Sequence, residues 1–221
     1  GRIRQVSLAA AVVGLAIFVY GAATGNDRAW HAFQVNWLFF SIIASAAVMF
    51  TAVQRITTAR WSRGVIRFLE GYSAFLPFAW VGLIVMVLFG KGHVYPWWNS
   101  LAELGHEKQV YLGHQFFALR SIGTFTVLVA LQLWYIWTSV RLDVGISPES
   151  GSGWAAGLRA RMRAGFGEER RELHSTHSLQ GKLAVFMAIA FGFGWCILAW
   201  DQSMSLDPHF YSTMYGWQVF M

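Results

Sequence analysis

Five long stretches without a charged side chain dominate this sequence. No Lys, Arg, Asp or Glu occurs within residues 5–26, 29–54, 71–90, 121–140 or 183–200. Each stretch is close to the roughly 20 apolar residues that a helix needs to cross about 30 Å of hydrocarbon. Because lipid cannot satisfy backbone hydrogen-bonding groups, we expect helices there. The sequence therefore predicts an all-α, polytopic transmembrane helix bundle.

The composition excludes most soluble classes of protein. Hydrophobic residues make up 56% of the chain and charged residues only 13%, against about 25% charged residues in soluble domains. A disordered chain, a coiled coil and a soluble enzyme are thus disfavoured. The chain begins at Gly1 and stops at Met221 inside an apolar run, and we expect it to be part of a longer protein. We treat residues 1–221 as one transmembrane domain, with spans expected near 6–24, 29–54, 72–90, 116–140 and 183–200 and a sixth starting near 215.

Basic residues lie almost entirely in alternate loops. The N-terminal tail and the second and fourth loops hold 13 of the 17 Lys and Arg residues. By the positive-inside rule these loops are expected in the cytoplasm. The net charge of +6 then reflects topology, and no nucleic-acid partner is expected.

Two loops have features of their own. The loop over residues 91–115 is long and contains the aromatic run Tyr95-Pro96-Trp97-Trp98, and we expect it to fold back along the outer interface. The loop over residues 141–182 contains a basic segment at 154–173. Two interpretations stay open for this segment: a helix lying on anionic lipid, or a solvated connector.

The sequence offers no set of ligands for a redox cofactor. Cys196 is the only cysteine, which argues against an iron–sulfur cluster, a Cys-based zinc site and a covalently attached haem. None of the seven histidines is expected at mid-membrane depth, so a haem held between facing helices is also disfavoured. We expect the chain to bind no haem or metal.

Ionisable residues at the membrane edge are the main candidates for function. Arg120 opens the fourth span and Asp201 closes the fifth, so the outer ends of two antiparallel helices place them within reach of an ion pair. Glu70 lies at the inner start of the third span. Such residues either serve chemistry or only orient two helices, and the sequence leaves both interpretations open.

Other polar residues extend this set. His114, Glu103, Glu107, Asp207 and His209 are expected near the outer edge, where titratable groups would suit proton transfer or a quinone headgroup. The alternative for Asp207-Pro208-His209 is a turn, because Asp before Pro favours a non-helical start.

The second span has a polar set of its own. Gln34, Ser41 and Ser45 share one helical stripe near His31 and Asn36. Such a stripe either holds helices together or lines a proton path.

The segment after the fifth span resembles a known family. Residues 201–216 read DQSMSLDPHFYSTMYG, which resembles the signature of the NrfD-like (PsrC-like) membrane subunits of alternative complex III. The similarity is to the second of its two NrfD-like subunits, the ActF family. Two further stretches agree, Ala74-Phe75-Leu76-Pro77 and the segment 108–120, and the similarity extends over residues 61–216. Gln202 and Phe210 stand where that family usually has tryptophan, and Gly113 where asparagine is expected.

The resemblance implies a role in respiratory quinol oxidation in a bacterial cytoplasmic (inner) membrane. Family members have about ten transmembrane helices around two four-helix bundles, so this chain would cover the first half. They carry no redox cofactor of their own, and a quinone (menaquinone or ubiquinone) and lipids are the expected ligands. The expected partners are a multihaem cytochrome c, an iron–sulfur subunit, the NrfD-like paralogue and a terminal oxidase.

The candidate residues for a proton path or quinone-headgroup site are therefore Asp201, Asp207, His209, Arg120, His114, His31 and Glu70. Two other functions stay open. A purely structural membrane anchor needs no titratable path. A secondary transporter should show spans broken by Gly or Pro at mid-membrane, whereas the only proline within a span, Pro77, lies near a helix start.

Overall fold

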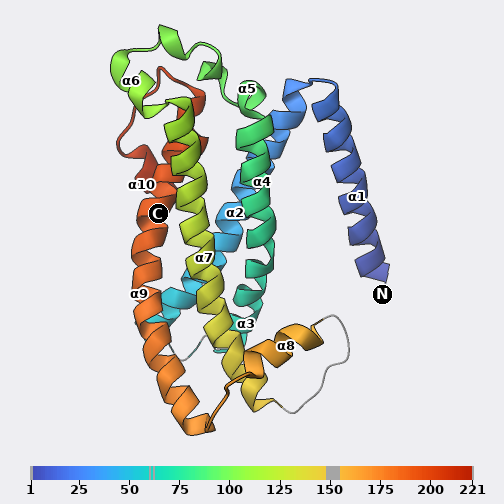
Figure 1. The fold of residues 1–221 in the computed structure, drawn as a ribbon, viewed down its shortest axis with the longest axis vertical. Coiled ribbons are helices and arrows are strands. Elements are labelled where there is room, and N and C mark those ends of the chain that lie inside the picture. The colour runs from blue at the N-terminus through green and yellow to red at the C-terminus, as the bar shows by residue number, and fades with distance from the viewer. Residues whose placement is uncertain (1, 60, 62, 148–154, 221) are drawn as a thin grey trace. The chain divides into compact units, whose positions relative to one another are not determined.

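The computed structural model describes residues 2–59, 61, 63–147 and 155–220. Within these ranges all regular secondary structure is helical, with no strand (Figure 1). Five helical segments are long and apolar enough to cross a membrane, which is the pattern of a multi-pass membrane protein. They are Arg2–Ala23, Asp27–Ile56, Gly64–Phe89, His114–Ile146 and Glu169–Leu206. Each contains one of the five uncharged stretches or most of it.

The first two helices are joined by a tight turn. Helix α1 covers Arg2–Ala23 and α2 covers Asp27–Ile56. Gly25 adopts a φ of 68° in this turn, a left-handed conformation that glycine takes without a steric penalty. The side chain of Asn26 accepts a hydrogen bond from the Arg28 amide at 3.0 Å, so it caps the start of α2.

The third apolar segment is interrupted near its beginning. Helix α3 covers Arg63–Gly71, a 3-10 turn η1 covers Tyr72–Phe75, and α4 covers Leu76–Phe89. Pro77 lies at the start of α4, where its missing N–H costs no helical hydrogen bond. The interruption therefore lies in the first half of the segment and leaves α4 unbroken.

The long loop after α4 is folded. It contains α5 (Lys91–Val94), η2 (Pro96–Trp98), η3 (Leu101–Glu103) and α6 (His106–Tyr111). Tyr95 and Trp97 are fully buried, and their rings pack edge-on against Phe117 at 4.9 and 5.0 Å. The aromatic run thus fixes the loop on the first turn of α7 (His114–Ile146).

The C-terminal part contains a short helix and a long one. Helix α8 covers Ala156–Arg163, α9 covers Glu169–Gln202, η4 covers Met204–Leu206 and α10 covers Tyr215–Phe220. Helix α9 begins 14 residues before the apolar run at 183–200. His174 and His177, which fall within the loop expected over residues 141–182, therefore lie in the first turns of this helix.

The chain forms two compact units. Unit one comprises Gly1–Ile42, Phe78–Gly123 and Cys196–Met221, and unit two comprises Ile43–Pro77 and Thr124–Trp195. Helices α2, α4, α7 and α9 contribute to both units. The core of unit one is aromatic, with Trp30, Trp37, Tyr95, Trp97 and Phe117 buried.

Unit two has a close contact between α7 and α9. A Cβ on Gly194 of α9 would come within 2.7 Å of the Leu128 side chain of α7, so a larger residue at this position requires Leu128 to shift. Phe125, Leu128 and Trp195 are buried around it.

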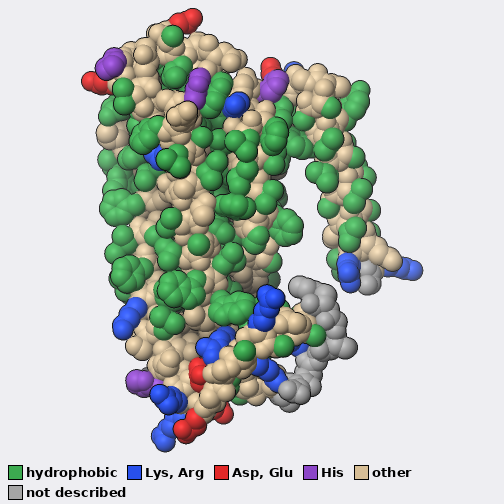
Figure 2. Space-filling model, in the orientation of Figure 1, with side chains coloured by type: hydrophobic (Ala, Val, Ile, Leu, Met, Phe, Trp, Pro, Cys, Tyr) green, Lys and Arg blue, Asp and Glu red, His purple; other side chains and the backbone are tan. Residues whose placement is uncertain are grey.

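The surface of the long helices is mostly apolar (Figure 2). Large side chains such as Phe78, Leu119 and Phe186 are more than 60% exposed, while Lys, Arg and His side chains gather toward helix ends (Figure 2). Exposed apolar side chains along a helix are what a lipid environment requires.

Candidate functional site

The most heavily hydrogen-bonded carboxylate in the described part of unit one is Asp201, which lies near the end of α9 and has no exposed surface. Its Oδ1 accepts a bond from Arg120 Nη2 at 2.6 Å, and its Oδ2 accepts one from Arg120 Nε at 3.0 Å. Ser121 Oγ and Tyr111 Oη donate to the same carboxylate at 2.9 and 3.3 Å. These four donors fill the acceptor positions of an ionised carboxylate. The ion pair expected between Arg120 and Asp201 is confirmed.

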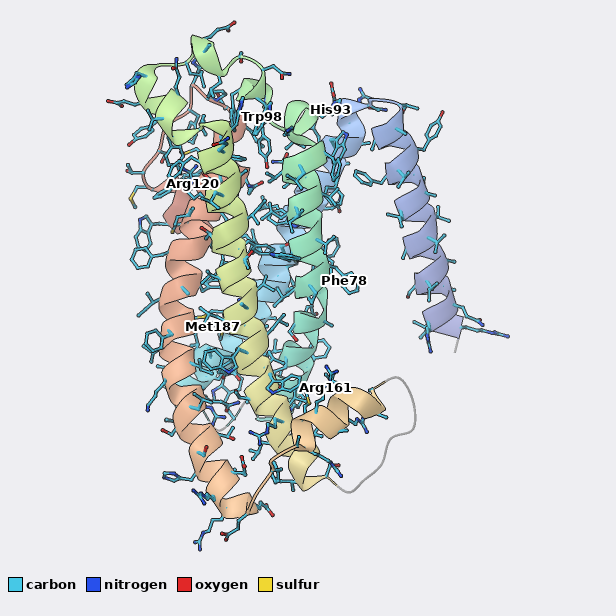
Figure 3. The ribbon with its side chains drawn as sticks, in the orientation of Figure 1. Phe78, His93, Trp98, Arg120, Arg161 and Met187 are labelled. Atoms are coloured by element: carbon cyan, nitrogen blue, oxygen red, sulfur yellow. The ribbon has the colours of Figure 1, made fainter. Side chains whose placement is uncertain are left out.

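Arg120 is held on its other side by aromatic rings. Its guanidinium carbon lies 3.8 Å from the centre of the Tyr111 ring and 4.7 Å from that of Phe116, within the range of a cation–π interaction. Its Nη1 also donates to the backbone carbonyl of Tyr111 at 3.1 Å. Arg120 and its neighbours on α7 are drawn in Figure 3. The arginine is therefore fixed by the start of α7, by α6 and by α9.

A second layer of polar groups surrounds the ion pair. Gln202 Nε2 donates to Ser121 Oγ at 3.2 Å, and Gln202 Oε1 accepts from Tyr95 Oη at 2.6 Å. Gln34 of α2 donates to the backbone carbonyl of Gln202 at 2.7 Å. Gln202, one of the departures from the family pattern, therefore links α9 to α7 and to the aromatic loop through its side-chain amide, and to α2 through its backbone carbonyl. We call Asp201, Arg120, Ser121, Gln202, Tyr95, Tyr111 and Gln34 the outer network.

Burial changes the acid–base behaviour of the two phenols. It raises the pKa of Tyr95 and of Tyr111 above the ordinary value of 10.0, and the negative charge of Asp201 raises both further. Arg120 partly opposes this effect at Tyr111. Both phenols are therefore neutral hydrogen-bond donors at physiological pH.

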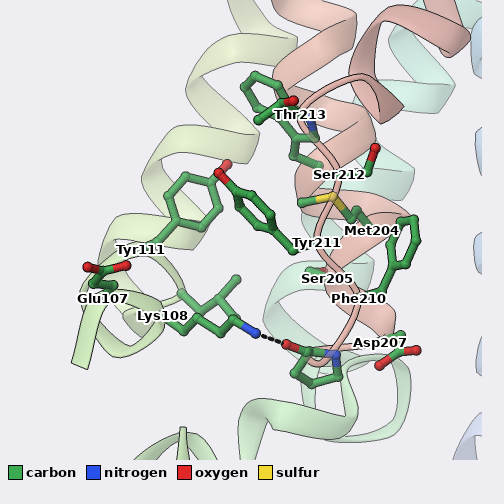
Figure 4. A pocket seen from close by; sticks show the side chains of 13 residues that line it. Glu107, Lys108, Tyr111, Met204, Ser205, Asp207, Phe210, Tyr211, Ser212 and Thr213 are labelled. Atoms are coloured by element: carbon green, nitrogen blue, oxygen red, sulfur yellow. Dashed lines mark hydrogen bonds between the residues drawn. The ribbon is translucent and has the colours of Figure 1, made fainter. Parts of the chain in front are cut away.

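A cavity of about 640 Å³ adjoins this network (Figure 4). One wall consists of residues 107–112 of the α6 region, and the other is the segment after α9 that carries the family resemblance. Lys108 Nζ donates to the carbonyl of Pro208 and so ties the two walls together. The lining residues are Glu107, Lys108, Tyr111, Leu112, Trp200, Met204, Ser205, Asp207, Pro208, Phe210, Tyr211, Ser212 and Thr213.

Tyr111 connects the cavity with the ion pair. Its ring lines the cavity, while its hydroxyl donates to Asp201. Trp200 also lines the cavity, and its indole N–H is buried with no hydrogen-bond partner within the described ranges. A buried N–H donor without a partner is a place where a ligand acceptor or a water would gain a hydrogen bond.

Asp207 and His209 lie outside the outer network. The Asp207 carboxylate accepts a hydrogen bond from the His209 amide at 3.0 Å, which is the geometry of an Asx turn. This contact favours the structural interpretation of the turn. Asp207 also lines the 640 Å³ cavity, whereas His209 lines a neighbouring hollow of about 390 Å³ with Glu103, His106 and Glu107.

The two other histidine candidates are exposed. His114 stacks on Trp98 with ring centres 4.1 Å apart, and its Nε2 lies 3.0 Å from the Trp98 carbonyl. His31 lies in the first turns of α2. Neither is among the hydrogen-bond partners found for Asp201 in the described structure.

Glu70 belongs to unit two and forms a separate cluster. It is 5% exposed, accepts a bond from Ser139 Oγ at 2.6 Å and pairs with Arg67. Arg67 also pairs with Asp143 at 2.6 Å. Glu70 is thus fixed between α3 and α7 of that unit.

The polar stripe on α2 supplies contacts between helices. Gln34 joins the outer network, and in unit two Ser45 Oγ accepts bonds from Gln132 at 2.6 Å and Trp195 at 2.9 Å. Ser41 is fully buried. These contacts favour the interpretation that the stripe holds helices together.

The sequence did not single out Tyr95, Ser121 or Gln202 as members of a site. The available signal was weak: each lies beside a residue that was noted, but their meeting depends on tertiary packing. Across the residues that the structure describes, no three His, Cys, Asp or Glu side chains gather as a metal site requires. No protein-family model matches this chain, and no curated protein matches it.

Proposed function

We propose that this chain is a membrane subunit of a respiratory quinol:electron-acceptor oxidoreductase of the alternative complex III type, and that the 640 Å³ cavity receives a quinol headgroup. The observation that supports this is the position of the cavity. Its longer wall is the segment 204–213, within the stretch that resembles the NrfD-like subunits.

The size and lining of the cavity suit a quinol ring. Ligand sites typically enclose about 300 to 1,000 Å³, with apolar walls and a few polar groups that fix orientation. Here Phe210, Tyr211 and Trp200 supply apolar surface, and Glu107 and Asp207 supply carboxylates. Oxidation of a quinol releases two protons and two electrons. The carboxylates accept the protons, and the electrons pass to a haem or iron–sulfur group of a partner subunit.

The outer network has a positioning role in this proposal. The Asp201 carboxylate fixes the hydroxyl of Tyr111, and the ring of Tyr111 forms part of the cavity wall. Because Asp201 is fully buried and has four donors, it orients Tyr111 and does not itself meet the quinol.

A purely structural anchor is the second candidate function. The complete hydrogen bonding of Asp201 and the Asx turn at Asp207 both favour it, because neither feature requires a ligand. The two candidate functions predict different rates of quinol oxidation when a bulky side chain fills the cavity.

The test fills the cavity in the assembled complex. Ser212→Trp adds an indole to a half-buried lining residue, and Met214→Trp adds the same ring to an exposed residue that does not line the cavity. We expect Ser212→Trp to lower quinol oxidation and extractable quinone at least tenfold, while Met214→Trp leaves both unchanged. Normal oxidation by a correctly assembled Ser212→Trp complex would support the anchor.

Asp201→Asn and His209→Ala separate the roles further. Quinol oxidation and proton release are measured together on the assembled complex. Reduced proton release in an intact complex supports a proton path, whereas failure of assembly supports the structural interpretation. The partners that co-purify also distinguish a respiratory complex from a transporter: multihaem and iron–sulfur polypeptides are expected with the complex and not with a transporter.

A further inference from the structure

Unit two has a basic hollow that the proposed function does not use. It has a volume of about 540 Å³ and lies on the first turns of α9. None of the five residues that line it is acidic. They are Arg170, Leu173, His174, His177 and Ser178.

The spacing of these residues brings their donors together. Positions 170, 174 and 177, with 178, recur at intervals of three and four, so they share one face of the helix. Their side chains present a guanidinium, two imidazoles and a hydroxyl. Several N–H and O–H donors around one hollow match the acceptor oxygens of a phosphate group.

A second cation is fixed next to the hollow. Arg55, at the end of α2, places Nη1 2.8 Å from His177 Nε2 and donates through Nη2 to Gln180 Oε1. Gln180 is 1% exposed, so a buried amide holds the arginine against the imidazole. Two basic groups in contact repel each other when both are charged, and an anion in the adjoining hollow would offset that repulsion.

Apolar side chains continue from this hollow along α9. The uncharged run begins at residue 183. Leu179, between the hollow and this run, is exposed, and so are Val185 and Phe186 within the run. The basic hollow therefore lies at the end of a helix surface suited to hydrocarbon. A ligand that carries a phosphate and acyl chains satisfies both parts.

We propose that this hollow binds the phosphate of an anionic phospholipid headgroup, and that the acyl chains lie along the exposed apolar face of α9. The proposal does not depend on the quinol cavity, which belongs to unit one. It concerns a lipid held at a defined position, which differs from general attraction of basic loops to a membrane surface.

The test compares two adjacent arginines in the full chain. Arg170 lines the hollow, while Arg171 is exposed and does not line it. The purified chain in detergent is titrated with phosphatidylglycerol or phosphatidylcholine, and bound lipid is counted by native mass spectrometry. Arg170→Gln is expected to weaken retention of phosphatidylglycerol about fivefold, the effect of one basic residue near an anionic surface. Arg171→Gln should change it less than twofold.

Further arms identify the source of the phosphate and guard against misfolding. Inorganic phosphate and glycerophosphoglycerol, which lack acyl chains, should not displace the lipid at millimolar concentration. Displacement by either would overturn the lipid proposal in favour of a soluble anion site. If Arg170→Gln does not fold, His177→Asn is tested in its place, and it too is expected to weaken retention of phosphatidylglycerol about fivefold. Equal losses for Arg170→Gln and Arg171→Gln, or no preference for phosphatidylglycerol over phosphatidylcholine, would also overturn the proposal.

Discussion

Asp201 shows how a single buried charge is stabilised in unit one. Its carboxylate loses all contact with solvent, and that loss is offset by Arg120 and two hydroxyl donors. Removing one partner of a buried ion pair leaves the other charge uncompensated, which typically costs about 3–5 kcal/mol. The pair therefore matters for folding whether or not it serves chemistry.

A double-mutant cycle measures this coupling. Asp201→Asn alone is expected to lower the free energy of unfolding by about 3 kcal/mol, because Arg120 then stays buried without a counter-charge. Arg120→Gln combined with Asp201→Asn should recover part of that loss, since no isolated charge remains. Denaturation by SDS in mixed micelles gives the free energies. Asp207→Asn is the control, because its carboxylate is outside the outer network; additive single losses would contradict the coupling.

Tyr95 makes stability depend on pH in the alkaline range. Burial raises the pKa of this phenol in the folded chain above its ordinary value of 10.0. Above about pH 10 the folded chain therefore keeps a phenol proton that the unfolded chain has lost. Stability is then full below about pH 10 and falls as the pH rises further. Tyr95→Phe should flatten this alkaline fall in the free energy of unfolding, although it loses the hydrogen bond to Gln202 at every pH.

Denaturant titrations at pH 8 to 11.5 test the Tyr95 effect. Tyr20→Phe is the control, since Tyr20 is exposed on α1 and outside the outer network. An alkaline slope that Tyr95→Phe leaves unchanged would rule out this phenol as its source.

At the scale of elements, α8 is fixed to α7 by hydrogen bonds from arginine side chains to backbone carbonyls. Arg163 donates to the carbonyls of Val144 and Ser147 at the end of α7. Arg141 of α7 donates in turn to the carbonyl of Met162 at 3.1 Å. Cationic side chains at a helix C-terminus satisfy its unpaired carbonyls, so part of the basic segment serves α7 itself.

Two glycines test the docking of α8. A side chain on Gly145 would come within 2.1 Å of the Phe166 ring, whereas Gly157 has nothing within 4 Å. Gly145→Ala should therefore displace Phe166 and α8, and hydrogen exchange of amides 156–163 should accelerate at least tenfold. Gly157→Ala should slow it slightly, because alanine favours helix by about 1 kcal/mol. Equal exchange in the two variants would show that Phe166 does not hold α8.

The long helices could be predicted from the sequence better than their ends. Runs without charge specify the spans because hydrocarbon excludes charged groups. The start of α9 at Glu169 lies outside that rule: Glu169 and Glu172 in its first turn favour a helix N-terminus through the helix dipole, a local effect that hydropathy does not detect.

The site was predictable only where topology determined it. The ends of two antiparallel spans brought Arg120 and Asp201 into reach, and the ion pair followed. The contact of Gln202 with Tyr95 depends on how a folded aromatic loop packs on α7. The cavity depends on the path of residues 204–213, most of which have no regular periodicity. Neither feature leaves a repeating signal in the sequence.

At the scale of the whole molecule, the charge distribution determines the expected orientation. The basic N-terminal tail and the second and fourth loops should face the cytoplasm, because positive charge is retained on that side during insertion. Asn99 belongs to the loop over residues 91–115 and Arg161 to the basic segment on α8, and both are exposed. They therefore report opposite sides of the membrane if the interpretation is correct.

Cysteine labelling in intact cells tests this orientation. Cys196 is the only native cysteine and is buried, so a Cys196→Ala background accepts single reporters without competing thiols. A membrane-impermeant maleimide should label Asn99→Cys from the periplasmic side and should label Arg161→Cys only after the membrane is permeabilised. Cys196→Ala without a reporter gives the background signal. Labelling of Arg161→Cys in intact cells, with Asn99→Cys protected, would reverse the proposed topology.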